Sequence, residues 1–168
     1  MDAETLRARQ SPLKERYRQE PESALITLKA RAELAQGVAC KVDTMAGPVT
    51  AGLHPATGGD GTEACSGDML LQALAGCAGV TLKAVATAIG VEIRSGTVHV
   101  EGLVDFRGTL GVSREAPVGF KEIRLRIELD TDAAQDKLDS LLKLTERYCV
   151  VFQTLRTSPG MTAVLTRR

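Results

Sequence analysis

The sequence carries no excess of either charge. Lys and Arg together number 21, and Asp and Glu together also number 21, in a chain of 168 residues. A neutral balance produces no broad field that would attract nucleic acid, an anionic membrane or an acidic protein. We therefore expect none of these as a partner.

Signals for export and for a disulfide framework are also lacking. Residues 1–10 contain neither an apolar core segment nor a small-residue cleavage site, so we expect a cytoplasmic protein. The four cysteines form no C-x-x-C motif. In a reducing compartment such cysteines more often indicate buried thiols or redox chemistry than structural disulfides.

Two stretches resemble a known sequence feature, a phosphate-binding loop and a membrane span, but each lacks part of it. The Gly-rich residues 57–61 lack the Lys-Ser/Thr of a P-loop and the spacing of a dinucleotide fingerprint, which favours a plain turn and no cofactor. Residues 69–91 are long and apolar enough to cross a membrane. They are rich in Ala and Gly, hold Lys83 near the middle and lack interfacial aromatics, so we expect a buried helix of a soluble protein.

The rest of the pattern predicts one domain behind a charged arm. A chain of this length can bury one continuous core. Residues 1–22 are crowded with charge and offer little to that core, so we expect a helical or frayed arm, followed by a domain at residues 23–168.

Strands are expected where apolar and polar residues alternate, and helices where apolar residues recur at three- and four-residue steps. The expected strands are residues 26–34, 38–42, 49–53, 91–106, 120–130 and 161–166. The first is expected to be half-buried, and the fifth to be irregular at Lys121-Glu122. The expected helices are residues 68–89, ended by Gly90, and residues 131–157. The order β-β-β-α-β-β-α-β clusters its strands, which is typical of the α+β class.

Cys77 is the first candidate for chemistry. It lies among small residues in Leu74-Ala75-Gly76-Cys77-Ala78-Gly79, so a neighbouring element can approach its sulfur closely. Thr81 lies on the same helix face, where its hydroxyl could donate a hydrogen bond to a thiolate. Because an apolar setting by itself raises the pKa of a thiol, a reactive Cys77 requires a cation or a further donor from elsewhere in the fold.

Cys149 is the second candidate, on the inner face of the second long helix with Thr145 and Phe152. If Thr145 begins a new helix, Cys149 falls in its first turn, and the helix dipole lowers the pKa of its thiol. If Thr145 continues a helix, that effect is lost. The sequence leaves both alternatives open, and it also leaves open that either cysteine is simply a small buried apolar residue.

The other two cysteines have simpler interpretations. Cys40 points the same way as Val38 and Val42, so we expect a small core residue. Cys65 precedes the first long helix and is interpreted as an incidental loop cysteine. Two alternatives are a second resolving thiol and a metal site made with Cys77, Cys149 and His54. The spacing matches no common zinc pattern, so no metal is expected.

Taken together, these features resemble the osmotically inducible protein C and organic hydroperoxide resistance (OsmC/Ohr) family, from about residue 25 to 166. The second cysteine at the family's distance makes the resemblance specific. The residues that carry it are Gly58-Gly59-Asp60-Gly61, Gly67-Asp68-Met69-Leu70-Leu71-Gln72-Ala73-Leu74-Ala75-Gly76-Cys77 and Glu146-Arg147-Tyr148-Cys149.

The resemblance implies an OsmC-like fold with two long central helices, in an intertwined homodimer with active sites at the subunit interface. In characterised members the residue matching Cys77 attacks a hydroperoxide and becomes a sulfenic acid. The residue matching Cys149 then condenses with it to a disulfide, without a cofactor. An unknown thiol reductant would regenerate the pair.

The chain departs from the family's hydroperoxidases at two positions. Those proteins carry a Glu ten residues before the first cysteine and an Arg near the first β-turn, which together activate the thiolate. Here Gly67 stands ten residues before Cys77, and no Arg lies near Gln36-Gly37-Val38. The segment ending in Cys149 is similar to that of a less characterised branch of the family.

Three functions are consistent with these observations. The first is cofactor-free, thiol-dependent reduction of organic hydroperoxides in a stress response, with Cys77 attacking and Cys149 resolving. The alternative, motivated by the missing Glu and Arg, is a non-catalytic protein that binds a small apolar ligand or an electrophile at the dimer interface. In the third, both cysteines only fill the core.

Overall fold

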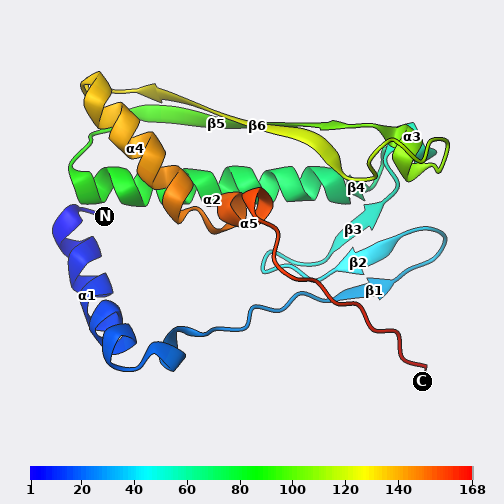
Figure 1. The fold of residues 1–168 in the computed structure, drawn as a ribbon, viewed down its shortest axis with the longest axis horizontal. Coiled ribbons are helices and arrows are strands. Elements are labelled where there is room, and N and C mark those ends of the chain that lie inside the picture. Colours follow the sequence, from blue (N-terminus) through cyan, green and yellow to red (C-terminus); the bar gives the residue numbers. More distant parts are fainter. Residues whose placement is uncertain (168) are drawn as a thin grey trace.

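One long helix and a two-stranded sheet form the main body of the molecule. The computed structural model describes residues 1–167. Helix α2 (Ser66–Ile89) runs along the antiparallel sheet of β5 (Ser95–Val104) and β6 (Phe120–Asp130), and α4 (Gln135–Tyr148) and α5 (Val150–Arg156) pack on another side of α2 (Figure 1). The expected α+β class is confirmed.

A second, smaller sheet lies beside the N-terminal end of α2 (Figure 1). Its strand order is β1-β2-β3-β4, with antiparallel pairing from β1 to β3 and parallel pairing between β3 and β4. The bounds are β1 (Ala32–Leu34), β2 (Cys40–Val42), β3 (Val49–Gly52) and β4 (Ala64–Cys65). The short helices η2 (Pro55–Thr57) and α3 (Phe106–Thr109) lie in the loops near this end.

Helix α2 buries only one of its faces. Leu74, Ala78, Leu82 and Ala86 recur every four residues and are buried, whereas Val80 is 74 % exposed. The helix ends as predicted at Gly90, whose left-handed backbone (φ 71°) suits glycine and whose N–H donates to the Ala86 carbonyl. By length and composition α2 could also cross a membrane, but here it packs against β5, α4 and α5 as the central helix of the fold.

The buried residues form two clusters along α2. In the first, Leu82 and Ala86 meet Val91 and Leu141, so α4 is fixed to the C-terminal half of α2. In the second, Leu74 and Ala78 meet Cys149, and side chains of β5, β6 and α5 pack around them. The fold thereby brings the second cysteine to the middle of α2.

The ladder between β5 and β6 contains the predicted irregularity. Leu103 pairs with Glu122, but the next residue, Val104, pairs with Phe120. Lys121 is therefore the extra residue of a β-bulge. The observed bounds of β6 agree with the predicted strand at residues 120–130.

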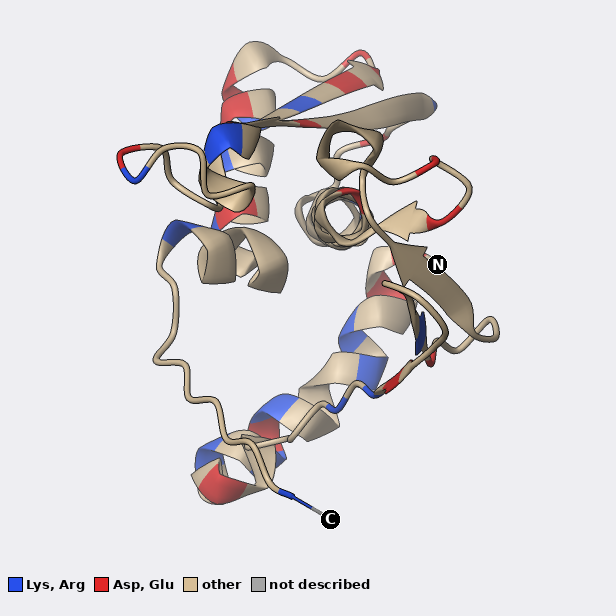
Figure 2. Ribbon diagram, turned by 90° about the vertical axis from the view of Figure 1, so that its right-hand side faces the viewer, with Lys and Arg blue, Asp and Glu red and all other residues tan. Residues whose placement is uncertain are grey.

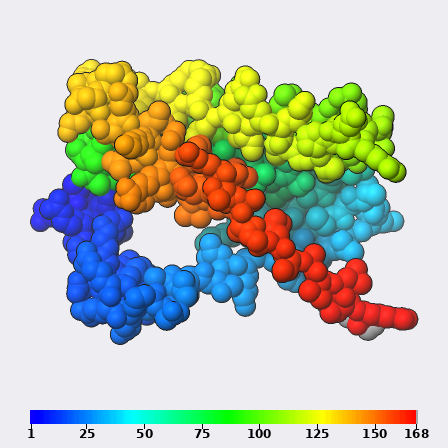
Figure 3. Space-filling view, in the orientation of Figure 1, coloured from blue at the N-terminus to red at the C-terminus, as the bar shows by residue number. Residues whose placement is uncertain are grey.

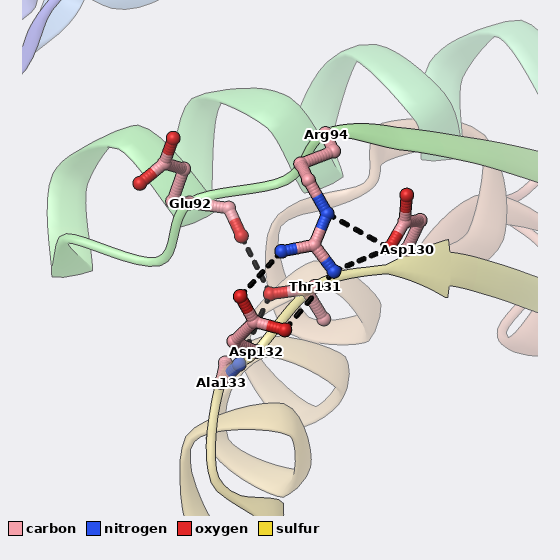
Figure 4. A network of polar contacts seen from close by, with 6 residues as sticks. All are labelled: Glu92, Arg94, Asp130, Thr131, Asp132 and Ala133. Atoms are coloured by element: carbon pink, nitrogen blue, oxygen red, sulfur yellow. Dashed lines mark hydrogen bonds and ion pairs between the residues drawn. The ribbon is translucent and has the colours of Figure 1, made fainter.

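A polar network joins the two strands at the opposite end of this sheet (Figure 4). The Arg94 guanidinium contacts the carboxylates of Asp130 and Asp132, with Nε 2.9 Å from Asp130. The Thr131 hydroxyl donates to the Glu92 carbonyl at 2.5 Å. These bonds hold the end of β6 against the start of β5 and so set where the chain turns into α4.

Two predicted strands are wrong or shortened. Of residues 26–34 only Ala32–Leu34 form a strand, and it is exposed rather than half-buried. Residues 161–166 form no strand; Met161, Val164 and Leu165 are 88 %, 87 % and 95 % exposed. Alternation produces a strand only where a neighbouring strand and an apolar face are available, and the described part of this single chain brings neither to residues 26–31 and 161–166.

Several boundaries also differ from the prediction. The strand expected at residues 91–106 is β5, which starts only at Ser95 because Val91 turns into the core. The long helix expected at residues 131–157 is two helices, α4 and α5, separated at Cys149. The short elements β4 and α3 were not predicted, since two to four residues carry no detectable period.

The charged arm contains a helix, which is one of the two expected forms, helical or frayed. α1 (Ala3–Gln19) begins at Asp2, whose carboxylate accepts from the Thr5 N–H, and is followed by η1 (Pro21–Ala24). Lys and Arg positions outnumber Asp and Glu positions along α1 (Figure 2). Open space separates the arm from α4 and α5 in the space-filling view (Figure 3).

The two neighbours Leu141 and Leu142 provide a direct test of the core. Leu141 is 1 % exposed and Leu142 is 47 % exposed. We expect Leu141→Ala to lower the free energy of unfolding by about 2–4 kcal/mol, because it leaves a cavity against α2. Leu142→Ala should lower it by less than about 1 kcal/mol. Urea titrations followed by circular dichroism, at one fixed protein concentration, measure both; equal losses would contradict the assignment of this core.

Candidate functional site

A break between two helices brings the thiols together. Thr145 continues α4, and its hydroxyl donates to the Leu141 carbonyl at 2.8 Å. Cys149 then adopts an extended backbone (φ −74°, ψ 108°) and becomes the residue that caps both α4 and α5. The Gln153 side chain donates to the Glu146 carbonyl at 2.7 Å, which satisfies one carbonyl left open by the break.

The first backbone amides of α5 point at Cys77. Burial is the largest single influence on the Cys77 thiol and raises its pKa. Hydrogen bonds from the Val151 N–H, the Cys149 thiol, the Val150 N–H and the Thr81 hydroxyl outweigh burial, so the pKa of Cys77 is lowered from its ordinary value. Thr81, as expected from the sequence, is among the groups that lower the pKa of Cys77, and the larger lowering influences come from Val151, Cys149 and Val150.

The pKa of the Cys149 thiol is shifted in the opposite direction. It is 1 % exposed, and burial, the largest influence, raises the pKa of its thiol. The Phe152 and Val151 amides lower the pKa, whereas the neighbouring Cys77 raises it, and the net direction is upward. The helix-start effect left open for Cys149 therefore acts more strongly on Cys77.

This arrangement separates two chemical roles. A thiol with a lowered pKa supplies a thiolate, which is the nucleophilic form of cysteine. A thiol with a raised pKa stays protonated and can donate a hydrogen bond to that thiolate. Cys77 is half-buried and so remains partly accessible, whereas Cys149 is enclosed. The site thus pairs a half-buried thiol of lowered pKa with a buried thiol of raised pKa.

The remaining cysteines lie elsewhere. Cys65 caps the start of α2, twelve residues before Cys77, which places it about 18 Å away along the helix axis. Since a disulfide requires Cα atoms within about 7 Å, Cys65 cannot resolve Cys77 of the same chain, and the four-residue metal site is not assembled. In the part of the chain that is described, no three His, Cys, Asp or Glu residues gather to hold a metal ion.

Cys40 and Cys65 lie on opposite faces of the small sheet, so Cys40 is not placed to pair with Cys65. It lies on β2 opposite Ala51, which in turn lies opposite Ala64, so these three share one face of the small sheet. Cys65 follows Ala64 and points to the other face. Cys40 is half-buried, in keeping with the expected small apolar residue.

The donors in Val150 and Val151 are the part of the site that the sequence analysis missed. They are backbone amides, which every residue except proline possesses, so no residue type marks them. Their availability depends on the helix break at Cys149, and the apolar period of residues 131–157 continues across that break. The helix break was indicated in the sequence only by the possible helix start near Thr145 and Cys149.

The fold and the site define a class of α+β proteins that hold two thiols between central helices. The chain belongs to the OsmC-like protein family, since a model of that family matches residues 59–163. A comparison with curated protein sequences finds no match.

Solved structures share the fold at low sequence identity. An OsmC-like protein from Mycoplasma pneumoniae has a TM-score of 0.66 and 19% identity, over 79% of this chain and 89% of the other. An organic hydroperoxide resistance protein OsmC from Legionella pneumophila has a TM-score of 0.62 and 20% identity, over 80% and 92%. The organic hydroperoxide resistance protein OhrB of Bacillus subtilis has a TM-score of 0.53 and 20% identity, over 80% and 94%.

The Thr81 hydroxyl is a separable part of the Cys77 environment. We expect Thr81→Val to raise the pKa of Cys77, because one hydrogen bond to the thiolate is lost. Alkylation of Cys77 by iodoacetamide at pH 7 should become roughly fivefold slower, and its rate should reach half-maximum at a higher pH. Peptide mass spectrometry across a pH series measures this rate.

Thr87→Val serves as the matched control. Thr87 lies on the same helix, and its hydroxyl donates to the Lys83 carbonyl at 2.8 Å rather than to a thiol. Its substitution should leave the alkylation profile of Cys77 unchanged. A profile that shifts equally in both variants, or in neither, would show that Thr81 does not tune the thiol.

Proposed function

We propose that this protein is a cofactor-free thiol peroxidase that reduces organic hydroperoxides in the cytosol. Cys77 is the attacking thiol and Cys149 the resolving thiol. The observation that supports the proposal is that Cys77 packs against buried Cys149 at the start of α5, where the Val150 and Val151 amides lower the pKa of Cys77. The names of the similar structures from Legionella pneumophila and Bacillus subtilis support the substrate class.

The reaction has two steps. The Cys77 thiolate attacks the terminal oxygen of the hydroperoxide, the O–O bond breaks, and the leaving alkoxide takes a proton to become an alcohol. Cys77 is then a sulfenic acid. The Cys149 sulfur attacks the Cys77 sulfur, its proton and the sulfenic hydroxide leave as water, and a disulfide forms. Two thiols have lost two electrons to the hydroperoxide, and an external dithiol must return them.

Amide dipoles take the part that charged residues have in the family's hydroperoxidases. Gly67 occupies the position of the expected Glu and has no side chain to offer. The influences that lower the pKa of Cys77 are hydrogen bonds from amides, a thiol and a hydroxyl. Such groups stabilise a thiolate without introducing a buried charge, which suits the apolar surroundings of the second core cluster.

Oxidation by one equivalent of cumene hydroperoxide tests this function. We expect loss of two thiols per chain and a disulfide between Cys77 and Cys149 in the peptide mass spectrum. In Cys149→Ser, oxidation should stop at a Cys77 sulfenic acid, which dimedone traps. In Cys77→Ser, thiols should be lost much more slowly than in the unmodified protein. Cys40→Ser, altered outside the site, should react like the unmodified protein.

The result that would overturn the function is equally definite. Prereduced protein that keeps all its thiols under excess hydroperoxide, while a known thiol peroxidase is oxidised in the same buffer, is not a peroxidase. Oxidation that proceeds unchanged in Cys77→Ser would place the reactive thiol elsewhere.

We further propose that the working form is a homodimer. The chain exposes 13070 Å², whereas a compact protein of 17.9 kDa exposes about 8,000 Å². Large apolar side chains contribute to the excess, including Leu25, Ile26 and Leu28, which are 73 %, 70 % and 87 % exposed. An excess of this size exceeds what a standard protein interface covers and matches an intertwined one.

The uncovered face of α2 is the natural centre of such an interface. Leu70, Ala73, Gly76 and Val80 are exposed and follow one another at three- and four-residue steps. Small residues at this spacing let a second helix approach closely. Cys77 borders this stripe, so a partner chain seated on it would cover the site and exclude water from the thiolate.

Replacing Val80 by Glu tests the dimer. We expect the unmodified protein to sediment as a dimer, and Val80→Glu to weaken the dimer by at least tenfold, because a carboxylate would be buried in the apolar interface. Val112→Glu, at a loop residue that is 73 % exposed, should leave the dimer intact. Sedimentation velocity over a concentration series measures this; an unmodified protein that stays monomeric at all concentrations excludes the dimer.

A further inference from the structure

A cavity lies at the N-terminal end of α2, away from the thiol pair. Its volume is about 490 Å³, within the range of small-molecule sites. Its wall is formed by the loop after β3, the start of α2, the end of β5, α3 and the start of β6. Gly67 is part of this wall and stands ten residues before Cys77, so the cavity is about 15 Å along the helix from the attacking thiol.

Close approaches at two glycines give the cavity its shape. A Cβ at Gly102 would lie 2.3 Å from the Phe120 ring, so glycine lets that ring lie across β5. A Cβ at Gly59 would lie 1.8 Å from the Leu53 carbonyl oxygen, so glycine lets the loop fold back over β3. Any larger residue at either position would displace a wall of the cavity.

Most of the wall is apolar. An apolar lining of this kind holds the hydrophobic body of a ligand and excludes water. The large apolar side chains include Leu53, Leu71, Leu103, Val104, Phe106 and Phe120.

His54 is the oriented polar group of the cavity. Its ring stacks on Phe106 with centroids 5.0 Å apart, and its Nδ1 accepts the Ala56 N–H at 3.0 Å. The neutral ring therefore carries its proton on Nε2, which is the nitrogen left to donate to a ligand.

The charge of the wall restricts the ligand further. Asp68 is the one charged residue, and no Lys or Arg is present, among the described residues that line the cavity. A carboxylate without a cation disfavours anions such as phosphates and fatty acids. The wall also contains Cys65, whose Sγ lies 3.6 Å from where a Cβ at Gly67 would be.

We propose that this cavity is a second binding site, which takes a small uncharged molecule with an apolar body and one hydrogen-bond acceptor for His54. The Cys65 thiol forms part of its wall and is covered when the ligand is bound. This site is independent of the peroxide reaction, because neither Cys77 nor Cys149 lines it.

Nile red, an uncharged dye with a carbonyl acceptor, is the probe. Its fluorescence should rise on binding to the unmodified full-length protein. Gly67→Leu should weaken binding at least tenfold, because its side chain extends from a Cβ position that lies 3.5 Å from Phe120 and fills the cavity without backbone clash. His54→Phe should weaken it about fivefold, because the ring stacking is kept and one donor is lost.

Alkylation of the unmodified protein tests the site without any substitution. Saturating Nile red should slow the reaction of Cys65 with N-ethylmaleimide at least fivefold and leave that of Cys40, which does not line the cavity, unchanged. A Cys65 that is not protected, or that is unreactive even without the dye, overturns the proposal. So does a well-folded Gly67→Leu protein that binds Nile red as tightly as the unmodified one. Neither readout uses hydroperoxide, so the site and the proposed function can fail separately.

Discussion

The break at Cys149 is the constraint on which the thiol site depends. If residues 135–156 formed one continuous helix, the amides of Val150 and Val151 would bond to carbonyls one turn earlier and could not reach Cys77. Because Cys149 is extended, these amides are free of such partners, and α5 presents them to α2. The same backbone turn buries the Cys149 thiol beside its neighbour. One local departure from helix geometry thus sets the protonation preference of both sulfurs.

The core that supports this site is incomplete in the single chain. Helix α2 is apolar nearly all round, yet its buried residues lie along one face. The segments at residues 26–31 and 161–166 have the alternation of strands but no neighbouring strand. The apolar pattern of a sequence reflects every surface that is buried in the working molecule, including surfaces buried against a second copy of the chain. The two mispredicted strands and the uncovered helix face therefore have a common explanation in the proposed homodimer.

The two sites use different physical means. At Cys77 the environment selects a charge state through hydrogen bonds directed at one sulfur atom. At the α2 N-terminal cavity the proposed selection is by shape and by a lining whose described residues include no Lys or Arg, with His54 as the directing group. Gly67 bears on both sites. It supplies no carboxylate, and the same lack of a side chain leaves room in the cavity.

Elements whose signal is local could be predicted from the sequence alone. The bounds of α2 follow from an uninterrupted apolar run ended by Gly90, and the bulge at Lys121 follows from a slip in the alternation of β6. Cys77, Cys149 and Thr81 could be named as site residues because of their types and spacing. Which thiol has the lowered pKa, and where the cavity at the N-terminal end of α2 lies, depend on the tertiary fold. The activating donors are backbone amides, which have no residue-type signature, and the cavity is enclosed by five segments that only the fold brings together.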